Sequence, residues 1–238
     1  DHQGIQITPQ TYPPIPAPIT ATFDSVAMPD VGDATEGLRG LGADGLLTSN
    51  QRTIVLWANI AEYNRALMAF GKGDWATRYM FFGQTNATTV SLYTADGVSG
   101  RIKTFTTPSV SLGWHCYILY MYSTNAAYLS VDGEPYITGV NANPFLPFTY
   151  TADIDRIIFQ ANGTDRSQFA LYNAPWTDND TVAYFEDLPL EPRDLTTWKT
   201  PTHDESPIVY YPFLQGDDRL TDAMGNVDLE LGEGITLT

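Results

Sequence analysis

Short runs of apolar and β-branched residues recur along most of the chain, separated by residues that favour turns. The runs lie at residues 52–60, 78–83, 88–94, 101–107, 114–122, 127–131, 135–138, 153–161 and 167–174. Between two of them, Asp132 and Gly133 suit the positive φ angles of a tight hairpin turn. Many short strands at this spacing predict an all-β fold, a two-sheet antiparallel jelly-roll β-sandwich, and not a parallel α/β sheet.

The most apolar run, residues 114–122, predicts a central strand that is buried on both faces. Side chains alternate between the two faces of a strand. One face carries Tyr117, Leu119 and Met121, and the other carries Cys116, Ile118 and Tyr120. Cys116 is the only cysteine, so a disulfide within the chain is impossible. Its place in this run predicts a buried, unreactive thiol.

One short helix is predicted after the last of these strands. Thr177 is a candidate N-cap, and Asp180 follows it at the spacing of a capping box. The apolar residues expected on one face of this helix are Val182, Phe185 and Leu188. Pro189 should end the helix, because proline cannot continue the helical hydrogen bonding.

The first twenty residues predict an extended arm outside the sandwich. Five prolines fall between Pro9 and Pro18, and proline fixes φ and removes amide donors. The arm is either a linker that lies on its own domain or a segment that docks on a neighbour. We expect self-association, or assembly with other subunits, through residues 1–20, and a single sandwich domain over residues 21–238.

The formal net charge of −16 limits the partners of this chain. No run of Lys or Arg offsets it, so we expect no binding to nucleic acid or to anionic membrane surfaces. No apolar stretch is long enough to span a bilayer, so membrane insertion is not expected either. The acidity fits a solvated acidic surface, high-salt surroundings or an affinity for divalent cations.

Five segments in order carry a resemblance to a known superfamily. They are "IVLWANI" (54–60), "LGWHCYILYMY" (112–122), "AYLSVDGEPY" (127–136), "DRIIFQANG" (155–163) and "FALYNAPWTDNDTVAYFEDL" (169–188). This order is similar to laminin-G-like domains of the concanavalin A-like superfamily and covers roughly Gly45–Leu188. The resemblance implies a jelly-roll sandwich that recognises ligands.

The C-terminal segment, residues 208–238, resembles a stretch that often precedes such a domain, although here it comes last. Two hypotheses fit this order. In the first, the segment supplies a terminal strand to the same sandwich, because chain ends often lie close together. In the second, it begins a further domain.

The residues expected of a hydrolase are incomplete. Retaining glycoside hydrolases of the same superfamily carry three carboxylates on one strand. Here Asp153 and Asp155 would share a face, but Ile158 stands where the last glutamate would be. His115 neighbours Cys116, and adjacent residues of a strand point to opposite faces, which disfavours a catalytic pair. We therefore expect a protein that is not an enzyme.

Candidate sugar-binding residues lie in the segment "KGDWATRY". They are Asp74, Trp75, Arg78 and Tyr79. An aromatic face can stack on a pyranose ring while polar groups bind its hydroxyls. Three further tyrosines, Tyr120, Tyr122 and Tyr128, are expected to form an aromatic cluster, either for packing or for ligand binding.

Calcium is the cofactor that the acidic loops could hold. They are Asp30–Asp33, Asp178–Asp180 and Asp217–Asp218, and the candidate metal ligands are Asp178 and Asp180. Calcium requires six to eight oxygen ligands, and none of these loops matches an EF-hand. The alternative is that the loops are simply solvated, as is common in so acidic a chain.

These observations favour a non-catalytic, lectin-like module that recognises a glycan or a cell-surface ligand, in an extracellular location or on a virion surface. The alternative is a structural virion component without ligand binding, such as a capsid decoration, fibre or tail protein of a virus or phage. A glycoside hydrolase is the third and least favoured hypothesis.

Overall fold

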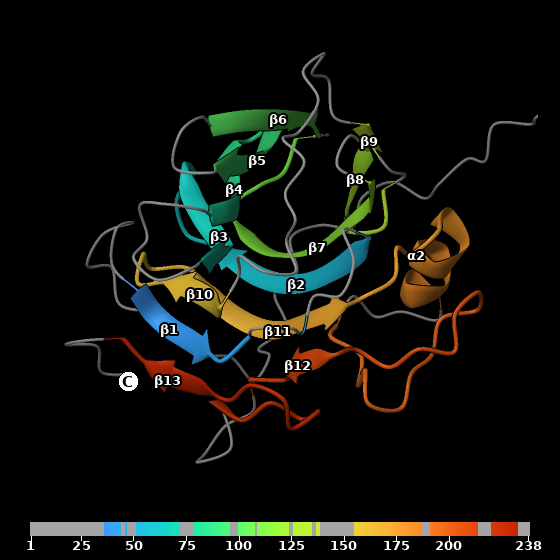
Figure 1. Cartoon of the computed structure of the whole chain (residues 1–238). Coiled ribbons are helices and arrows are strands. Elements are labelled where there is room, and N and C mark those ends of the chain that lie inside the picture. The colour runs from blue at the N-terminus through green and yellow to red at the C-terminus, as the bar shows by residue number, and fades with distance from the viewer. Residues whose placement is uncertain are drawn as a thin grey trace, which may run out of the picture.

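The described strands form two antiparallel sheets, and helix α2 lies beside them (Figure 1). The computed structural model describes residues 36–43, 46, 51–71, 79–95, 100–107, 109–123, 126–134, 137–138, 155–186, 191–213 and 220–232. The predicted arm, residues 1–20, lies outside these ranges. The elements are β1 (Glu36–Leu41), β2 (Arg52–Ile60), β3 (Arg65–Gly71), β4 (Tyr79–Asn86), β5 (Thr89–Ala95), β6 (Gly100–Thr106), β7 (Gly113–Ser123), β8 (Ala126–Val131), β9 (Ile137–Thr138), β10 (Arg156–Gln160), β11 (Asp165–Tyr172), α2 (Asp178–Phe185), β12 (Val209–Tyr211) and β13 (Leu229–Leu231).

The strand order confirms the predicted all-β jelly-roll sandwich. One sheet has seven strands in the order β13-β1-β10-β3-β4-β5-β6, and the other has six in the order β12-β11-β2-β7-β8-β9. The turn between β8 and β9 has the predicted backbone, because Asp132 and Gly133 adopt φ angles of 53° and 83°. Positive φ at both positions matches the right-handed twist of the flanking strands.

The inner faces of the two sheets enclose the main hydrophobic core. Strand β7 lies between β2 and β8, as expected for the most apolar run. Its inward side chains Tyr117, Leu119 and Met121 are buried in this core. The core also takes in apolar residues from both C-terminal strands, among them Val209 and Leu229.

A second apolar cluster covers the outer face of the six-stranded sheet. Its members are Val55, Trp57, Cys116, Ile118, Ala170, Tyr172, Trp176, Tyr184, Leu195 and Tyr210. Helix α2 and the segment after it supply several of these residues and so shield this face from water. The Cys116 thiol is free and fully buried, and burial raises its pKa, which confirms the expected buried thiol.

Helix α2 begins with the predicted capping box between Thr177 and Asp180. Of the predicted apolar face, Phe185 packs against the second cluster and Val182 is half-buried. The fully buried residues of the helix are instead Asp180, Thr181 and Tyr184. Tyr184 is buried because its hydroxyl has hydrogen-bond partners beneath the helix. The helix ends at Phe185, before Leu188 and Pro189, which lie outside the described residues.

The C-terminal segment completes the same two sheets. β12 pairs antiparallel with β11, and β13 pairs antiparallel with β1. β12 therefore forms an edge of the six-stranded sheet, and β13 forms an edge of the seven-stranded sheet. The described part of this segment therefore agrees with the first hypothesis, in which the C-terminal segment adds terminal strands to the same sandwich.

Candidate ligand-binding site

Three tyrosines gather on the outer face of the six-stranded sheet. Tyr120 and Tyr122 share this face because they are two residues apart on β7. Tyr128 on β8 stands directly opposite Tyr120 in the ladder. The Tyr120 and Tyr128 rings stack with centroids 4.9 Å apart, and the Tyr122 ring meets them edge-on at 5.1 Å and 6.0 Å. The predicted aromatic cluster is confirmed.

The three rings differ in their exposure to solvent. Tyr120 is 4% exposed and forms the floor of the cluster, whereas Tyr122 is 36% exposed. Tyr128 is intermediate. An exposed tyrosine that is held in place by two neighbouring rings can receive a ligand without first having to be ordered.

The start of α2 adds polar groups beside the tyrosines. Thr177, Asp178 and Asn179 form one wall of a cleft of about 540 Å³, and Tyr120, Tyr122 and Tyr128 form the rest of its described lining. Asp178 and Asn179 are exposed. The cleft thus combines aromatic faces with a carboxylate, an amide and hydroxyl groups.

The negative charge of Asp178 acts on the two tyrosines of β7, Tyr120 and Tyr122. The Asp178 side chain lies close to the Tyr120 hydroxyl. Burial, and then the charge of Asp178, raise the pKa of Tyr120, and the same two causes raise the pKa of Tyr122. Both phenols therefore keep their protons at neutral pH and can donate hydrogen bonds.

Asp180 fixes the wall of the cleft in place. Its carboxylate accepts hydrogen bonds from the Thr177 amide and hydroxyl, both at 2.7 Å, and from the Thr202 amide at 3.0 Å and the Thr202 hydroxyl. Burial opposes ionisation, but these hydrogen bonds outweigh it and hold the pKa of Asp180 below its ordinary value. A charged Asp180 therefore links the start of α2 to the segment that contains Thr202.

A chain of buried hydrogen bonds attaches α2 to the sheet. Trp57 Nε1 donates to the Tyr184 hydroxyl at 2.8 Å, and that hydroxyl donates to Gln168 Oε1 at 2.8 Å. Gln168 Nε2 in turn donates to the Tyr210 hydroxyl at 3.0 Å. Buried polar networks that are fully paired make a core rigid. The position of the wall relative to the tyrosines is set by this network.

The predicted calcium ligands serve other contacts in this structure. Asp180 directs both carboxylate oxygens at protein donors, and Asp178 lies against Tyr120. Among the residues that the structure describes, no group of three acidic, histidine or cysteine side chains is placed to hold a metal ion. Calcium binding stays a prediction.

The predicted sugar-binding loop falls almost entirely outside the described residues. Asp74, Trp75 and Arg78 are not described, and Tyr79 is described only as the first backbone position of β4. The structure therefore leaves this prediction untested.

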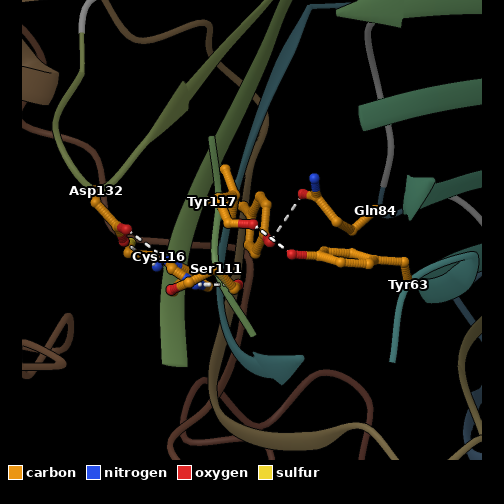
Figure 2. A network of polar contacts seen from close by, with 8 residues as sticks. Tyr63, Gln84, Ser111, Cys116, Tyr117 and Asp132 are labelled. Atoms are coloured by element: carbon orange, nitrogen blue, oxygen red, sulfur yellow. Dashed lines mark hydrogen bonds and ion pairs between the residues drawn. The ribbon is translucent and has the colours of Figure 1, made fainter. Parts of the chain in front are cut away.

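A separate polar network involves the Gly113 end of β7 (Figure 2). His115 Nδ1 lies 2.6 Å from Asp132 Oδ2, and its Nε2 lies 2.8 Å from the Ser111 carbonyl oxygen. The Cys116 amide donates to the other Asp132 oxygen at 2.8 Å. Both ring nitrogens of His115 are engaged by these partners, so neither serves the Cys116 thiol as a base. Sequence reasoning missed this pair, although the tight turn at Asp132 was predicted.

The same network continues toward the seven-stranded sheet. Figure 2 shows the Tyr117 side chain directed at Gln84, and its hydroxyl donates to Gln84 Oε1 at 3.0 Å. The Tyr63 hydroxyl donates to the Val110 carbonyl oxygen at 2.8 Å. These bonds satisfy polar groups in or beside the core, which indicates a structural role.

No family model and no curated protein matches this sequence. Solved structures do match its fold. A putative carbohydrate binding protein from Bacteroides ovatus superposes with a TM-score of 0.53 at 14% identity, over 92% of this chain and 60% of that chain. A heptameric SAP-like pentraxin from Limulus polyphemus gives a TM-score of 0.49 at 8% identity, over 71% and 84% of the two chains.

A sialidase CBM40 from Ruminococcus gnavus, bound to α2,6-sialyllactose, gives a TM-score of 0.44 at 16% identity, over 67% and 98% of the two chains. The likeness to the Bacteroides ovatus protein is one of fold, and the fold is the two-sheet jelly-roll sandwich that the sequence indicated. In the described part of the chain, no helix has the length and apolar character needed to cross a bilayer.

Proposed function

We propose that this chain is a non-catalytic glycan-binding module and that the tyrosine cleft is its ligand site. The cleft consists of Tyr120, Tyr122, Tyr128, Thr177, Asp178 and Asn179. The observation that carries the proposal is the exposed ring of Tyr122, held by two neighbouring rings at the mouth of a cleft whose opposite wall is polar.

The chemistry of the cleft suits a sugar. The apolar face of a pyranose can lie on an aromatic ring, while its hydroxyls exchange hydrogen bonds with amide, carboxylate and phenol groups. Its volume of about 540 Å³ falls within the range of roughly 300–1,000 Å³ that small-molecule sites occupy. The fold of the Bacteroides ovatus protein, described as a putative carbohydrate binding protein, supports the proposal by analogy.

The sequence supports three further proposals, on a second contact, on calcium and on location. A second contact to a longer glycan would come from the predicted sugar-binding loop, with Asp74, Trp75, Arg78 and Tyr79. Calcium would assist binding, and the protein would act outside the cell. A purely structural role in a virion is the alternative; its sequence support comes mainly from residues 1–20, which the structure does not describe.

A glycan array, run with calcium and with a chelator, identifies the ligand class and tests the calcium proposal. Isothermal titration with the best glycan then compares the wild type with Tyr122→Ala and with the control Leu112→Ala. Leu112 is 48% exposed and precedes the opposite end of β7. We expect Tyr122→Ala to weaken binding about tenfold or more, equivalent to roughly 1.4 kcal/mol, and Leu112→Ala to leave it unchanged.

Two results would overturn the proposal. If no glycan binds, the module is not a lectin. If Tyr122→Ala binds as the wild type does, the site lies elsewhere, and Trp75→Ala becomes the variant that tests the loop.

A further inference from the structure

We infer that the tyrosine cleft selects sugars that carry a protonated amine and rejects sugars that carry a carboxylate. The inference rests on the proposed glycan-binding function and concerns the ligand class of the same site. Its basis is the charge of the cleft: among the described residues that line it, Asp178 is the one charged side chain, and it lies beside three tyrosines.

Tyrosine rings and a carboxylate attract the same kind of group. The face of an aromatic ring carries partial negative charge, so an ammonium group over it is stabilised by roughly 0.5–2 kcal/mol, depending on how far it is desolvated. Tyr122 offers an exposed ring, and Asp178 lies in the same cleft. An amino group bound there can contact a ring face and the carboxylate together.

The Asp178 carboxylate is held in position to meet such a group. It occupies the first turn of α2, where the helix dipole favours negative charge. Tyr120 lies beside it on the floor of the same cleft. A carboxylate has two oxygens with several acceptor sites, so Asp178 can accept hydrogen bonds from an ammonium donor.

The same negative charge disfavours the binding of anionic sugars. A sialic or uronic acid would bring its carboxylate toward Asp178, and no Lys, Arg or His stands among the described lining residues to compensate. The net charge of −16 adds a long-range repulsion at low ionic strength. The geometry therefore disfavours sialylated ligands at this cleft.

Isothermal titration of the full chain at low ionic strength, near pH 6, tests the inference. The probes are a glucosamine tetramer with free amines, its N-acetylated counterpart as the matched neutral sugar, sialyllactose, and choline as a cation without a sugar. We expect the amine-bearing tetramer to bind at least tenfold more tightly than the neutral one. Choline and sialyllactose should bind more weakly than either tetramer.

Two variants separate Asp178 from the overall charge. Asp178→Asn should abolish the preference for the amine, so that the variant binds the two tetramers about equally. Glu62→Gln removes one exposed negative charge from the loop after β2, which adjoins the opposite end of β7, and should preserve the preference. Far-ultraviolet dichroism confirms that each variant folds.

Each contrary result has a defined meaning. The inference is wrong if the wild type binds the two tetramers with equal affinity, or if Asp178→Asn keeps the full preference for the amine. In both cases the glycan-binding proposal stands. An equal loss of preference in Glu62→Gln assigns the effect to net charge and also overturns it. Choline binding as tightly as the amine-bearing tetramer shows a site for cations alone. If no saccharide binds, the proposed function itself fails.

Discussion

Asp222 organises the loop that leads into β13. Its Oδ1 accepts hydrogen bonds from the amides of Tyr210 and Met224 at 2.8 Å and 3.0 Å, and its Oδ2 accepts from Asn226 and Val227 at 2.9 Å and 3.0 Å. The side chain is 2% exposed. One buried carboxylate thus accepts hydrogen bonds from four backbone amides and connects β12 to the loop before β13. An acidic residue of the C-terminal segment therefore stabilises the fold.

Replacing Asp222 should destabilise the protein more than a surface substitution would. Asp222→Ala leaves four amides without their acceptor, and we expect the free energy of unfolding to fall by about 3 kcal/mol. Asp222→Asn keeps the shape and one acceptor oxygen, so its loss should be smaller. Urea denaturation measures both values. A change below about 1 kcal/mol for Asp222→Ala would show that water replaces the carboxylate without cost.

At this scale the sequence predicts contacts along a strand but not contacts across the fold. The grouping of Tyr120 and Tyr122 follows from the alternation of side chains on a strand, and Tyr128 follows from the hairpin. The position of Asp178 beside them does not, because it depends on Tyr184 reaching Trp57 and Gln168 beneath α2. Sequence reasoning therefore identified Asp178 as a possible metal ligand rather than as part of an aromatic site.

Helix α2 illustrates how one element is held by charge. The hydrogen bonds from Thr177 and Thr202 favour ionised Asp180, so its pKa is lower in the folded chain than its ordinary value of 3.8. A carboxyl group with a lowered folded pKa contributes stability above its unfolded pKa and loses that stability as the pH falls through its folded pKa. Its contribution is therefore complete at neutral pH and declines below about pH 3.8.

Asp180→Asn tests this contribution directly. The variant should be less stable than the wild type at pH 7, and the difference in melting temperature should shrink as the pH is lowered from 4 toward 2, because acid neutralises Asp180 in the wild type. Thermal melts at several pH values make the comparison. A difference that does not change with pH would mean that Asp180 acts through its shape and not through its charge.

Two strands of the seven-stranded sheet, β1 and β3, were not predicted from the sequence, because their residues have weak local preferences for strands. β1, with the sequence EGLRGL, contains two glycines and two charged residues, which are poor strand signals. β3, with the sequence RALMAFG, is rich in alanine, leucine and methionine, which favour helices. Both become strands because pairing with β10 and burial in the core outweigh their local preferences. The strongly β-branched and aromatic runs, such as β2 and β7, were predicted correctly.

For the whole molecule, the sandwich is built from strands far apart in the chain. The C-terminal strands β12 and β13 lie at the edges of different sheets, which explains why the final segment could not be assigned from its order in the sequence. The assembly proposal concerns residues 1–20 alone. Deleting them should leave the β-sandwich intact and weaken self-association, because their prolines prevent regular strand pairing within the domain.

Light scattering of the full-length and truncated chains over a range of concentrations tests the proposal for the arm. The full-length chain should form a larger species, and the truncated chain should remain smaller while its far-ultraviolet dichroism is unchanged. If both chains are monomers at high concentration and melt at the same temperature, residues 1–20 are only a linker.

The central claim is that a glycan binds in the tyrosine cleft, and amide chemical-shift mapping of the full chain with the best glycan tests it most directly. We predict that the perturbed amides cluster at Tyr120, Tyr122 and Tyr128 and at Thr177–Asn179, with little change around Leu112. Perturbations confined to the loop around Trp75, or the absence of any saturable perturbation, would contradict the account.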